Sequence, residues 1–263
     1  VCRQALKLTD KTWRCEGNHS YDVAKQGYVN LHVVQQKKKK NPGDTPESVQ
    51  ARRAFLSAGF YAPLQQAVVA KIRELRIENL LDIGCGEGYY THAMQAEVLQ
   101  CVGVDIAKNA VQVAAKLNKN VTWIVGTGAT LPVLEKSIDL CSSLFSPIPQ
   151  QELLRVLEQQ GYLMVVTPAQ GHLYAMREAL FEEVNPHEPH KFIQQLEAEF
   201  DLVSEQVIDA PLTLSQQDLK HLIAMTPYAY KAKVERRQAL EQHDTFAVNA
   251  QFQLYLFQKK SAL

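Results

Sequence analysis

The chain has 263 residues, of which 46% are hydrophobic, and its 28 Lys and Arg residues balance its 28 Asp and Glu residues to a formal net charge of zero. This length allows one large domain, or a large domain with a small appendage. The sequence has no run of about 18 uncharged apolar residues, so we expect no membrane span, and its start is unlike a secretion signal. Cys85, Cys101 and Cys141 are predicted to be reduced core thiols, which favours the cytoplasm.

The charges are unevenly distributed along the chain. Residues 1–53 hold eleven Lys and Arg against five Asp and Glu, so this stretch carries an excess of six positive charges and the remainder an excess of six negative charges. A basic segment on an acidic body indicates a local site for a polyanion. A solvated charged linker is the alternative that charge alone leaves open.

The first unit covers residues 1–36 and contains three residues of the kinds that bind zinc. Cys15 and His19 are four positions apart, and Cys2 lies thirteen positions before Cys15. Zinc usually takes four ligands, and the partner of Cys2 would fall just before Val1, so both zinc and chance spacing stay open. Alternating apolar residues over 10–34 predict short antiparallel strands. So small a unit buries little core, and a metal would stabilise it.

Residues 37–45 are predicted to be a basic linker, because four consecutive lysines at 37–40 precede a Pro-Gly pair. The second domain, residues 46–263, opens with a helix signal in which Asp44 can cap, Pro46 suits the first turn and Glu47 follows Asp44 by three positions. The apolar pattern that continues to Ile72 predicts one or two helices.

From residue 79 onward, apolar runs alternate with amphipathic stretches, which predicts a parallel sheet with helices on both faces. Residues 182–190 are rich in Pro and His and are predicted to be a loop. The predicted strands are 79–84, 100–105, 121–126, 138–144, 161–167, 201–208 and 250–258. The predicted helices are 89–98, 108–117, 149–159, 171–181, 214–224 and 228–242.

The first of these strands ends in the most informative motif of the chain, in which Asp82 precedes glycines at 84, 86 and 88. Tyr89 stands where a dinucleotide fingerprint needs its last glycine, and no Gly-Lys-Ser/Thr is present, so a P-loop is excluded. Asp105 ends the next strand, where an acid binds ribose hydroxyls. This pattern resembles the first two motifs of class I S-adenosylmethionine-dependent methyltransferases. A nicotinamide or flavin enzyme is the alternative class. A plain turn would explain the glycines alone and a helix cap would explain Asp105 alone, but neither explains both at this spacing.

Ligands in such sheets bind at the carboxyl ends of the strands. These ends predict a site formed by residues 84–89, 105–106, 126–130, 145–148 and 168–172. Methyltransferases that act on exocyclic amines often carry Asn/Asp-Pro-Pro-Tyr/Phe after the fourth strand. The chain has Phe145-Ser146-Pro147-Ile148 there, which disfavours an N6-adenine methyltransferase.

Several runs spread along the chain are informative as a set, namely Cys15-x3-His19, 21–31, 51–56, Gly59-x-Tyr61-x-Pro63-Leu64, 81–92 and 225–233. Through these runs, nearly the whole chain resembles RlmA-type 23S rRNA (guanine-N1)-methyltransferases. The resemblance implies an α/β fold with a class I (Rossmann-like) methyltransferase sheet and a small N-terminal zinc-binding domain that helps to grip an rRNA hairpin. It implies that zinc is held by Cys2, Cys15 and His19. The residues expected at S-adenosylmethionine are Tyr61, Asp82, Gly84, Gly86, Glu87, Gly88, Tyr89, Asp105 and His172.

The target atom sets the chemistry, since guanine N1 carries a proton that must be lost before it becomes a good nucleophile. No residue stands out as the base, and His172 and the loop 182–190 are the candidates. Tyr228 and Tyr230 are candidates to stack on RNA bases, and the basic residues at 37–40, 52 and 53 to hold phosphates. A small-molecule methyltransferase and a non-catalytic rRNA-binding factor are the alternatives, and a homodimer stays open.

Overall fold

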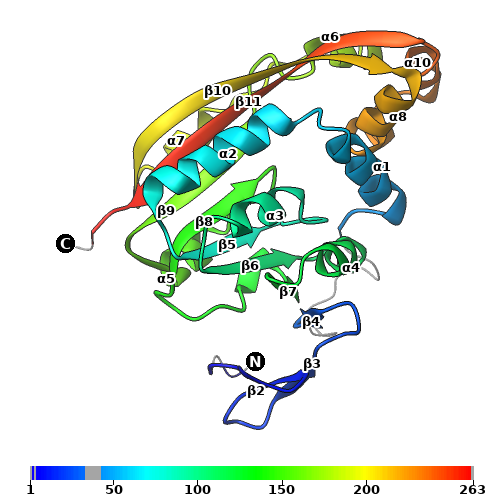
Figure 1. Cartoon of the computed structure of the whole chain (residues 1–263). Helices are drawn as coiled ribbons and strands as arrows, with labels where there is room; N and C mark the ends of the chain where they lie inside the picture. The colour runs from blue at the N-terminus through cyan, green and yellow to red at the C-terminus, as the bar shows by residue number, and fades with distance from the viewer. Residues whose placement is uncertain (1, 3, 33–42, 262–263) are drawn as a thin grey trace.

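A computed structural model of the chain describes residue 2, residues 4–32 and residues 43–261 (Figure 1). The four predicted linker lysines at 37–40 lie outside the described residues. The chain begins with a three-stranded antiparallel ribbon at one end of the molecule, which confirms the prediction of short antiparallel strands. Its strands are β1 (Lys7–Thr9), β2 (Thr12–Arg14) and β3 (Ser20–Asp22).

An eight-stranded sheet forms the body, in the order β10-β11-β9-β8-β5-β6-β7-β4. The strands from β4 to β9 run parallel, and β11 and β10 are added antiparallel at the far edge, where they arch over the molecule in Figure 1. The strand bounds are β4 (Tyr28–Asn30), β5 (Asn79–Ile83), β6 (Gln100–Asp105), β7 (Thr122–Val125), β8 (Ile138–Leu144), β9 (Leu157–Pro168), β10 (Phe200–Ser215) and β11 (Thr245–Lys259).

Strand β4 is an addition that the alternation of strands and helices did not predict. It lies within the first predicted unit, yet it pairs in parallel with β7, with Tyr28 opposite Trp123 and Asn30 opposite Val125. Leu31 extends the pairing by donating its backbone N–H to the Val125 carbonyl at 2.9 Å. The segment after the ribbon therefore forms an edge of the main sheet.

Neighbouring residues of β5 separate two hydrophobic cores. Leu80 packs in a buried cluster with residues of α1 to α4, α6, α8 and α10, whereas Leu81 packs in a second cluster with α5 and α7. Successive side chains of a strand point to opposite faces of the sheet, so helices cover both faces, as a parallel sheet requires. The helices are α1 (Pro46–Ser57), α2 (Ala62–Leu75), α3 (Tyr89–Gln95), α4 (Lys108–Leu117), α5 (Gln150–Val156), α6 (Tyr174–Leu180), α7 (Lys191–Leu196), α8 (Gln216–Ala224), α9 (Tyr228–Lys231) and α10 (Val234–Leu240).

Several predicted boundaries were wrong for local reasons. Thr45, not Asp44, caps α1, because its side chain accepts a hydrogen bond from the Ser48 N–H. The predicted helix 149–159 ends at Val156, since β9 begins at Leu157 and residues 158–161 bulge opposite Asp139. The predicted helix 228–242 is interrupted by extended backbone at Ala232 and Lys233. Helix α7 was not predicted, and no helix in the described ranges is long and apolar enough to cross a membrane.

Candidate active site and metal centre

A cavity of about 1620 Å³ opens at the carboxyl ends of the parallel strands, where the sequence predicted the site. It is lined by residues that follow β5, β6, β7, β8 and β9. Its lining also includes the start of α1, residues 224–230 and Phe252. Of the nine residues expected at the cofactor, this cavity brings together seven, namely Tyr61, Gly84, Gly86, Glu87, Tyr89, Asp105 and His172.

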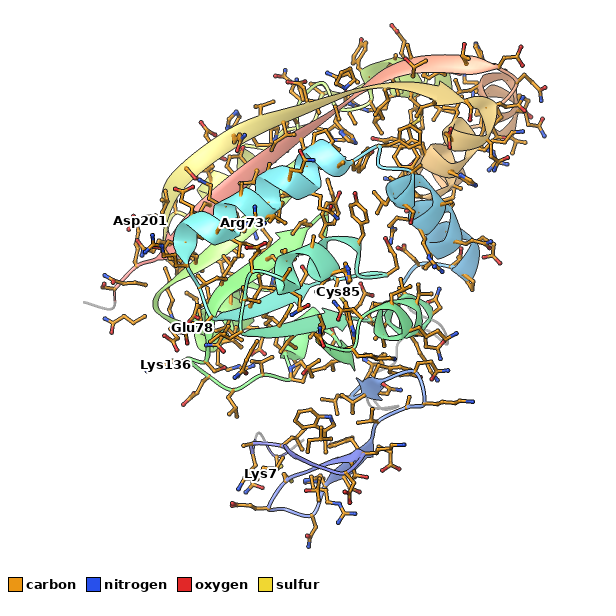
Figure 2. The ribbon with its side chains drawn as sticks, in the orientation of Figure 1. Lys7, Arg73, Glu78, Cys85, Lys136 and Asp201 are labelled. Atoms are coloured by element: carbon orange, nitrogen blue, oxygen red, sulfur yellow. The ribbon has the colours of Figure 1, made fainter. Side chains whose placement is uncertain are left out.

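The glycine loop after β5 needs residues without a side chain at alternate positions. Gly84, Gly86 and Gly88 all have positive φ, at 75°, 56° and 84°, a region that residues with a Cβ rarely adopt. A Cβ on Gly84 would also lie 2.4 Å from the Cβ of Ser146. Cys85 marks this loop in Figure 2, at the end of β5 opposite to Glu78. Gly84 and Gly86 line the cavity, so the backbone of the loop lies directly at its wall.

Asp105, at the end of β6, is held in place by two backbone donors. Its carboxylate accepts hydrogen bonds from the Gly86 N–H at 2.9 Å and from the Ala107 N–H at 2.7 Å. Burial raises the pKa of Asp105, and these two hydrogen bonds oppose that rise. Each oxygen keeps a lone pair, because a carboxylate oxygen accepts two hydrogen bonds. Asp105 can therefore accept further donors from a ligand in the cavity.

The structure places Asp82 beneath the glycine loop and not on the cavity wall. Its two oxygens accept hydrogen bonds from the Thr91 hydroxyl at 2.5 Å and the Ser142 hydroxyl at 2.7 Å. These donors belong to α3 and β8, so the carboxylate joins the helix after the loop to the neighbouring strand. Burial raises the pKa of Asp82 from its usual 3.8 to about 6. The structure thus gives Asp82 a role in shaping the loop.

The raised pKa predicts a pH-dependent contribution of Asp82 to stability. A carboxyl group whose pKa is higher in the folded than in the unfolded protein contributes most below pH 4, and this contribution is lost as the pH rises toward 6. A shift of about two units corresponds to about 3 kcal/mol. The free energy of unfolding of the wild type, relative to Asp82→Asn, should therefore decrease between pH 4 and 6.5 in urea titrations. Parallel pH profiles of the two proteins would refute the assignment.

A buried glutamate lies beside an arginine at the rim of the loop. Glu87 is 5% exposed, and its Oε2 has no hydrogen-bond partner within the described part of the chain. The nearest cation is the Arg52 guanidinium, 3.5 Å away, which also binds Asp44. Burial raises the pKa of Glu87, and Arg52 opposes that rise. Arg52, which the sequence predicts to hold a phosphate, is thus paired with two carboxylates at the rim of the loop.

His172 follows β9 in a fixed orientation. Its Nδ1 lies 2.8 Å from the carbonyl oxygen of Gln251, and a carbonyl only accepts, so Nδ1 carries the proton and Nε2 keeps a lone pair. Phe252 packs at 5.0 Å between ring centroids. Burial lowers the pKa of His172 to about 3. His172 is therefore neutral near pH 7, where it is a hydrogen-bond acceptor and a weak base.

Several aromatic rings line the cavity. Tyr61, which precedes α2, packs edge-on against Phe252 at 4.7 Å, and Tyr228 and Tyr230 come from α9. Tyr230 is 78% exposed, whereas the Tyr228 hydroxyl lies 3.4 Å from His187 Nε2 in the predicted loop 182–190. Tyr230 therefore offers an exposed ring face at the cavity, on which a nucleobase can stack.

Cys2, Cys15 and His19 meet at the ribbon. The Sγ atoms of Cys2 and Cys15 are 3.5 Å apart, and Cys15 Sγ is 3.3 Å from His19 Nδ1. All three ligand atoms lie within 4.8 Å of one another. Zinc bonds of about 2.3 Å to sulfur and about 2.0 Å to nitrogen at tetrahedral angles require separations close to these. The donor set therefore fits a zinc ion with one further ligand.

The residues that hold the predicted site residues in place were not predicted from the sequence. Thr91 and Ser142 bind Asp82, and the Gln251 carbonyl orients His172. The position of Thr91, three residues after Gly88 on the first turn of the predicted helix, could have indicated its contact with the loop. Nothing in the sequence indicates the contact of Gln251, because only the pairing of β11 with β9 brings it to His172.

A parallel sheet with this glycine loop, an acid at the end of the second strand and a cavity over both defines a class I methyltransferase. Residues 80–161 match the family described as "Methyltransferase domain", and residues 1–40 match "RlmA, N-terminal", a zinc ribbon. The 23S rRNA (guanine(748)-N(1))-methyltransferase of Streptomyces fradiae is 32% identical over 237 residues, which cover 87% of this chain and 84% of that protein. The chain belongs to the RlmA-type family of 23S rRNA (guanine-N1)-methyltransferases, which use S-adenosylmethionine.

Solved structures support the fold. The crystal structure of YcgJ from Bacillus subtilis has a TM-score of 0.52 at 18% identity and covers 75% of this chain and all of that one. The [4+2]-cyclase SpnF has the same TM-score and identity, and the match covers 76% of this chain and 82% of that one. The likeness to a cyclase shows that the fold alone does not determine the reaction.

Proposed function

We propose that this protein transfers the methyl group of S-adenosylmethionine to N1 of a guanine in a hairpin of 23S rRNA. The observation that carries the proposal is the similarity to the Streptomyces fradiae enzyme, which spans both the ribbon and the sheet. The cavity supports it, since its wall holds the loop and acid of a nucleoside site together with the exposed ring of Tyr230. A ribosomal substrate also favours the cytoplasm.

The residues around the glycine loop fit the cofactor, which supplies a methyl group made electrophilic by its sulfonium. Asp105 has free lone pairs for ribose hydroxyls. Oε2 of Glu87 lies 3.5 Å from Arg52 but accepts no hydrogen bond within the described residues, so it can accept one from an ammonium group. Tyr61 and Tyr89 enclose the cavity beside the loop. Asp82 and Gly88 contribute indirectly, because they shape the loop without lining the cavity.

The ribbon is proposed to grip the rRNA. Cys2, Cys15 and His19 would hold zinc there and fix the three short strands. Tyr228 and Tyr230 would receive the target base or its neighbours by stacking, since every base offers a ring face. A guanine inside a hairpin must leave its stack to reach the cavity.

The proposed function is tested by methyl transfer from labelled S-adenosylmethionine to unmodified 23S rRNA, followed by digestion and mass spectrometry of the nucleosides. We expect 1-methylguanosine with the wild type, and none without RNA or with Asp105→Ala. Transfer of the labelled methyl group to a small molecule in the absence of RNA would refute the rRNA assignment. Cofactor binding without transfer to any substrate would indicate a non-catalytic factor.

Tyr230→Ala should weaken RNA binding and leave the cofactor site intact. Stacking of one base on an aromatic side chain contributes about 1–3 kcal/mol, so the KM for rRNA should rise about tenfold or more. Cofactor affinity, measured by calorimetry, should not change. Tyr174→Ala is the matched control, because Tyr174 is 50% exposed but does not line the cavity. Equal KM values for the two variants would contradict the stacking role.

A further inference from the structure

Arg177, on α6, is a buried cation without a carboxylate partner. It is only 6% exposed, and it forms no ion pair with any residue in the described ranges. Its Nη2 donates to the carbonyl oxygen of Asn185, whereas its Nη1 is buried with no hydrogen-bond partner. A buried charge is costly unless it is paired. The fold therefore maintains a positive charge here that nothing in the described structure neutralises.

The groups around Arg177 adjoin the wall of the active-site cavity. His187 lies two residues after Asn185 and contacts the Tyr228 hydroxyl at 3.4 Å, and its ring is 6.2 Å from that of His172. Tyr228 and His172 both line the cavity. Burial lowers the pKa of His172 to about 3 and of His187 to about 4, and the charge of Arg177 adds to both effects. Burial raises the pKa of Tyr228, and Arg177 opposes that rise.

Around Tyr228 and His172 the cavity wall has no strong base. His172 and His187 are neutral and weakly basic near pH 7. Of the carboxylates that line the cavity, Glu87 and Asp105 lie at the glycine loop, Asp44 and Glu47 lie at the start of α1, and Glu152 binds Arg155. A guanine that donates N1 to a methyl group passes through a state with negative charge on N1 and O6 once its proton has left. A fixed cation in a poorly hydrated setting stabilises such a charge strongly.

We propose that Arg177 is a positioning residue whose charge, acting from behind Tyr228 and His187, stabilises the N1-deprotonated guanine. This inference rests on the proposed function. The N1 proton passes to water, the N1 lone pair forms the bond to the methyl carbon, and the electron pair of the broken carbon–sulfur bond stays on sulfur. No protein base is required, because the cation makes N1 more acidic.

The other charged groups on the elements packed around α6 are paired or lie outside the cavity. The β11 residues that share a buried cluster with α6, among them Val248, Ala250 and Phe252, carry no charge. Glu182 pairs with Lys233 at 2.7 Å, and Arg237 lies 3.5 Å from Glu241. Arg236 donates to the Phe181 carbonyl at 3.1 Å. On α6 and α9 themselves, Glu178 and Lys231 do not line the cavity. Arg177 is therefore the cation that His172, His187 and Tyr228 share.

The test is the pH dependence of kcat for methyl transfer to 23S rRNA, measured with saturating rRNA between pH 6 and 9 for the wild type, Arg177→Met and Arg177→Lys. We expect Arg177→Met to shift the rising limb of the profile by about one pH unit upward, so that kcat falls about tenfold at pH 7 and recovers at high pH. Arg177→Lys keeps the charge and should retain the wild-type profile. Thermal unfolding and cofactor binding check that each variant is folded.

Three results would overturn the inference while the wild type still forms 1-methylguanosine. The first is an unchanged profile for Arg177→Met. The second is a loss of kcat that is equal at every pH, which a merely structural role produces. The third is a higher KM for rRNA with no shift in pH, which indicates a phosphate contact. If Arg177→Met does not fold, Arg177→Gln, which keeps a donor for the Asn185 carbonyl, replaces it. A wild type that forms no 1-methylguanosine would instead refute the proposed function.

Discussion

Gly88→Ala should abolish methyl transfer and markedly destabilise the protein. A Cβ at this position would lie 2.7 Å from Trp123 Cη2 and 3.0 Å from the Ala114 Cβ. Trp123 cannot move away easily, because it is 1% exposed and its indole N–H donates to the Asn118 carbonyl at 2.8 Å. Overpacking of this kind costs about 1–3 kcal/mol. Relief of the clash would displace the loop, so cofactor affinity should fall together with stability.

Gly59→Ala separates the clash from the backbone strain. Gly59 has a φ of 85°, nearly the same as that of Gly88 at 84°, but a Cβ there would meet nothing within 4 Å. A left-handed conformation alone costs a residue with a Cβ about 1–2 kcal/mol. Urea unfolding should therefore show a smaller loss for Gly59→Ala, with cofactor affinity in calorimetry unchanged. Equal losses in both variants would show that the contact with Trp123 is unimportant.

Cys15→Ala should remove bound zinc and, with it, most methyl transfer to rRNA. Cys15 lies between the other two ligands, within 3.5 Å of both, so its loss leaves two donors, which hold the metal poorly. The ribbon has three strands of three residues each and little core of its own. We expect zinc to be absent in elemental analysis, rRNA methylation to fall at least tenfold and cofactor affinity to remain.

The matched control for the metal site is Cys101→Ala. Cys101 is also a buried free thiol, at 3% exposure, but it lies on β6 away from the ribbon. This variant should keep its zinc. Chelation of the wild type should reproduce the Cys15→Ala result and be reversed by added zinc. A Cys15→Ala protein that retains zinc, or that methylates rRNA normally without it, would contradict the proposed role.

The features that the sequence predicted well are set by local residue patterns. The glycine loop and Asp105 depend on a strand, a turn and the start of a helix, all within about 25 residues, and the structure places both on the cavity wall. The apolar runs of β5, β6 and β8 are buried on both sides, so their strands could be located from composition alone. Cys85, Cys101 and Cys141 are buried free thiols as predicted.

The features that could not be predicted from the sequence depend on contacts between distant segments. Asp82 was expected to face the ligand, but Ser142 and Thr91 hold it below the loop, and Ser142 is sixty residues away. The orientation of His172 depends on Gln251, seventy-nine residues away. Arg177 carried no signal in the sequence, because a single arginine on a short helix is normally exposed. Only its burial beside Tyr228 and His187 distinguishes it.

The pairing of β4 with β7 limits how freely the two parts of this enzyme could be exchanged or produced separately. A fragment that begins at residue 46 would lose β4, and the backbone N–H and C=O groups of β7 that face β4 would lose their partners, while those that face β6 would stay paired. Such an open strand is a template for association between chains. The ribbon, in turn, would lose the strand that ties it to the sheet. Swapping the ribbon between relatives to redirect them to other rRNA sites therefore requires a junction after residue 32, so that the native edge strand travels with the ribbon.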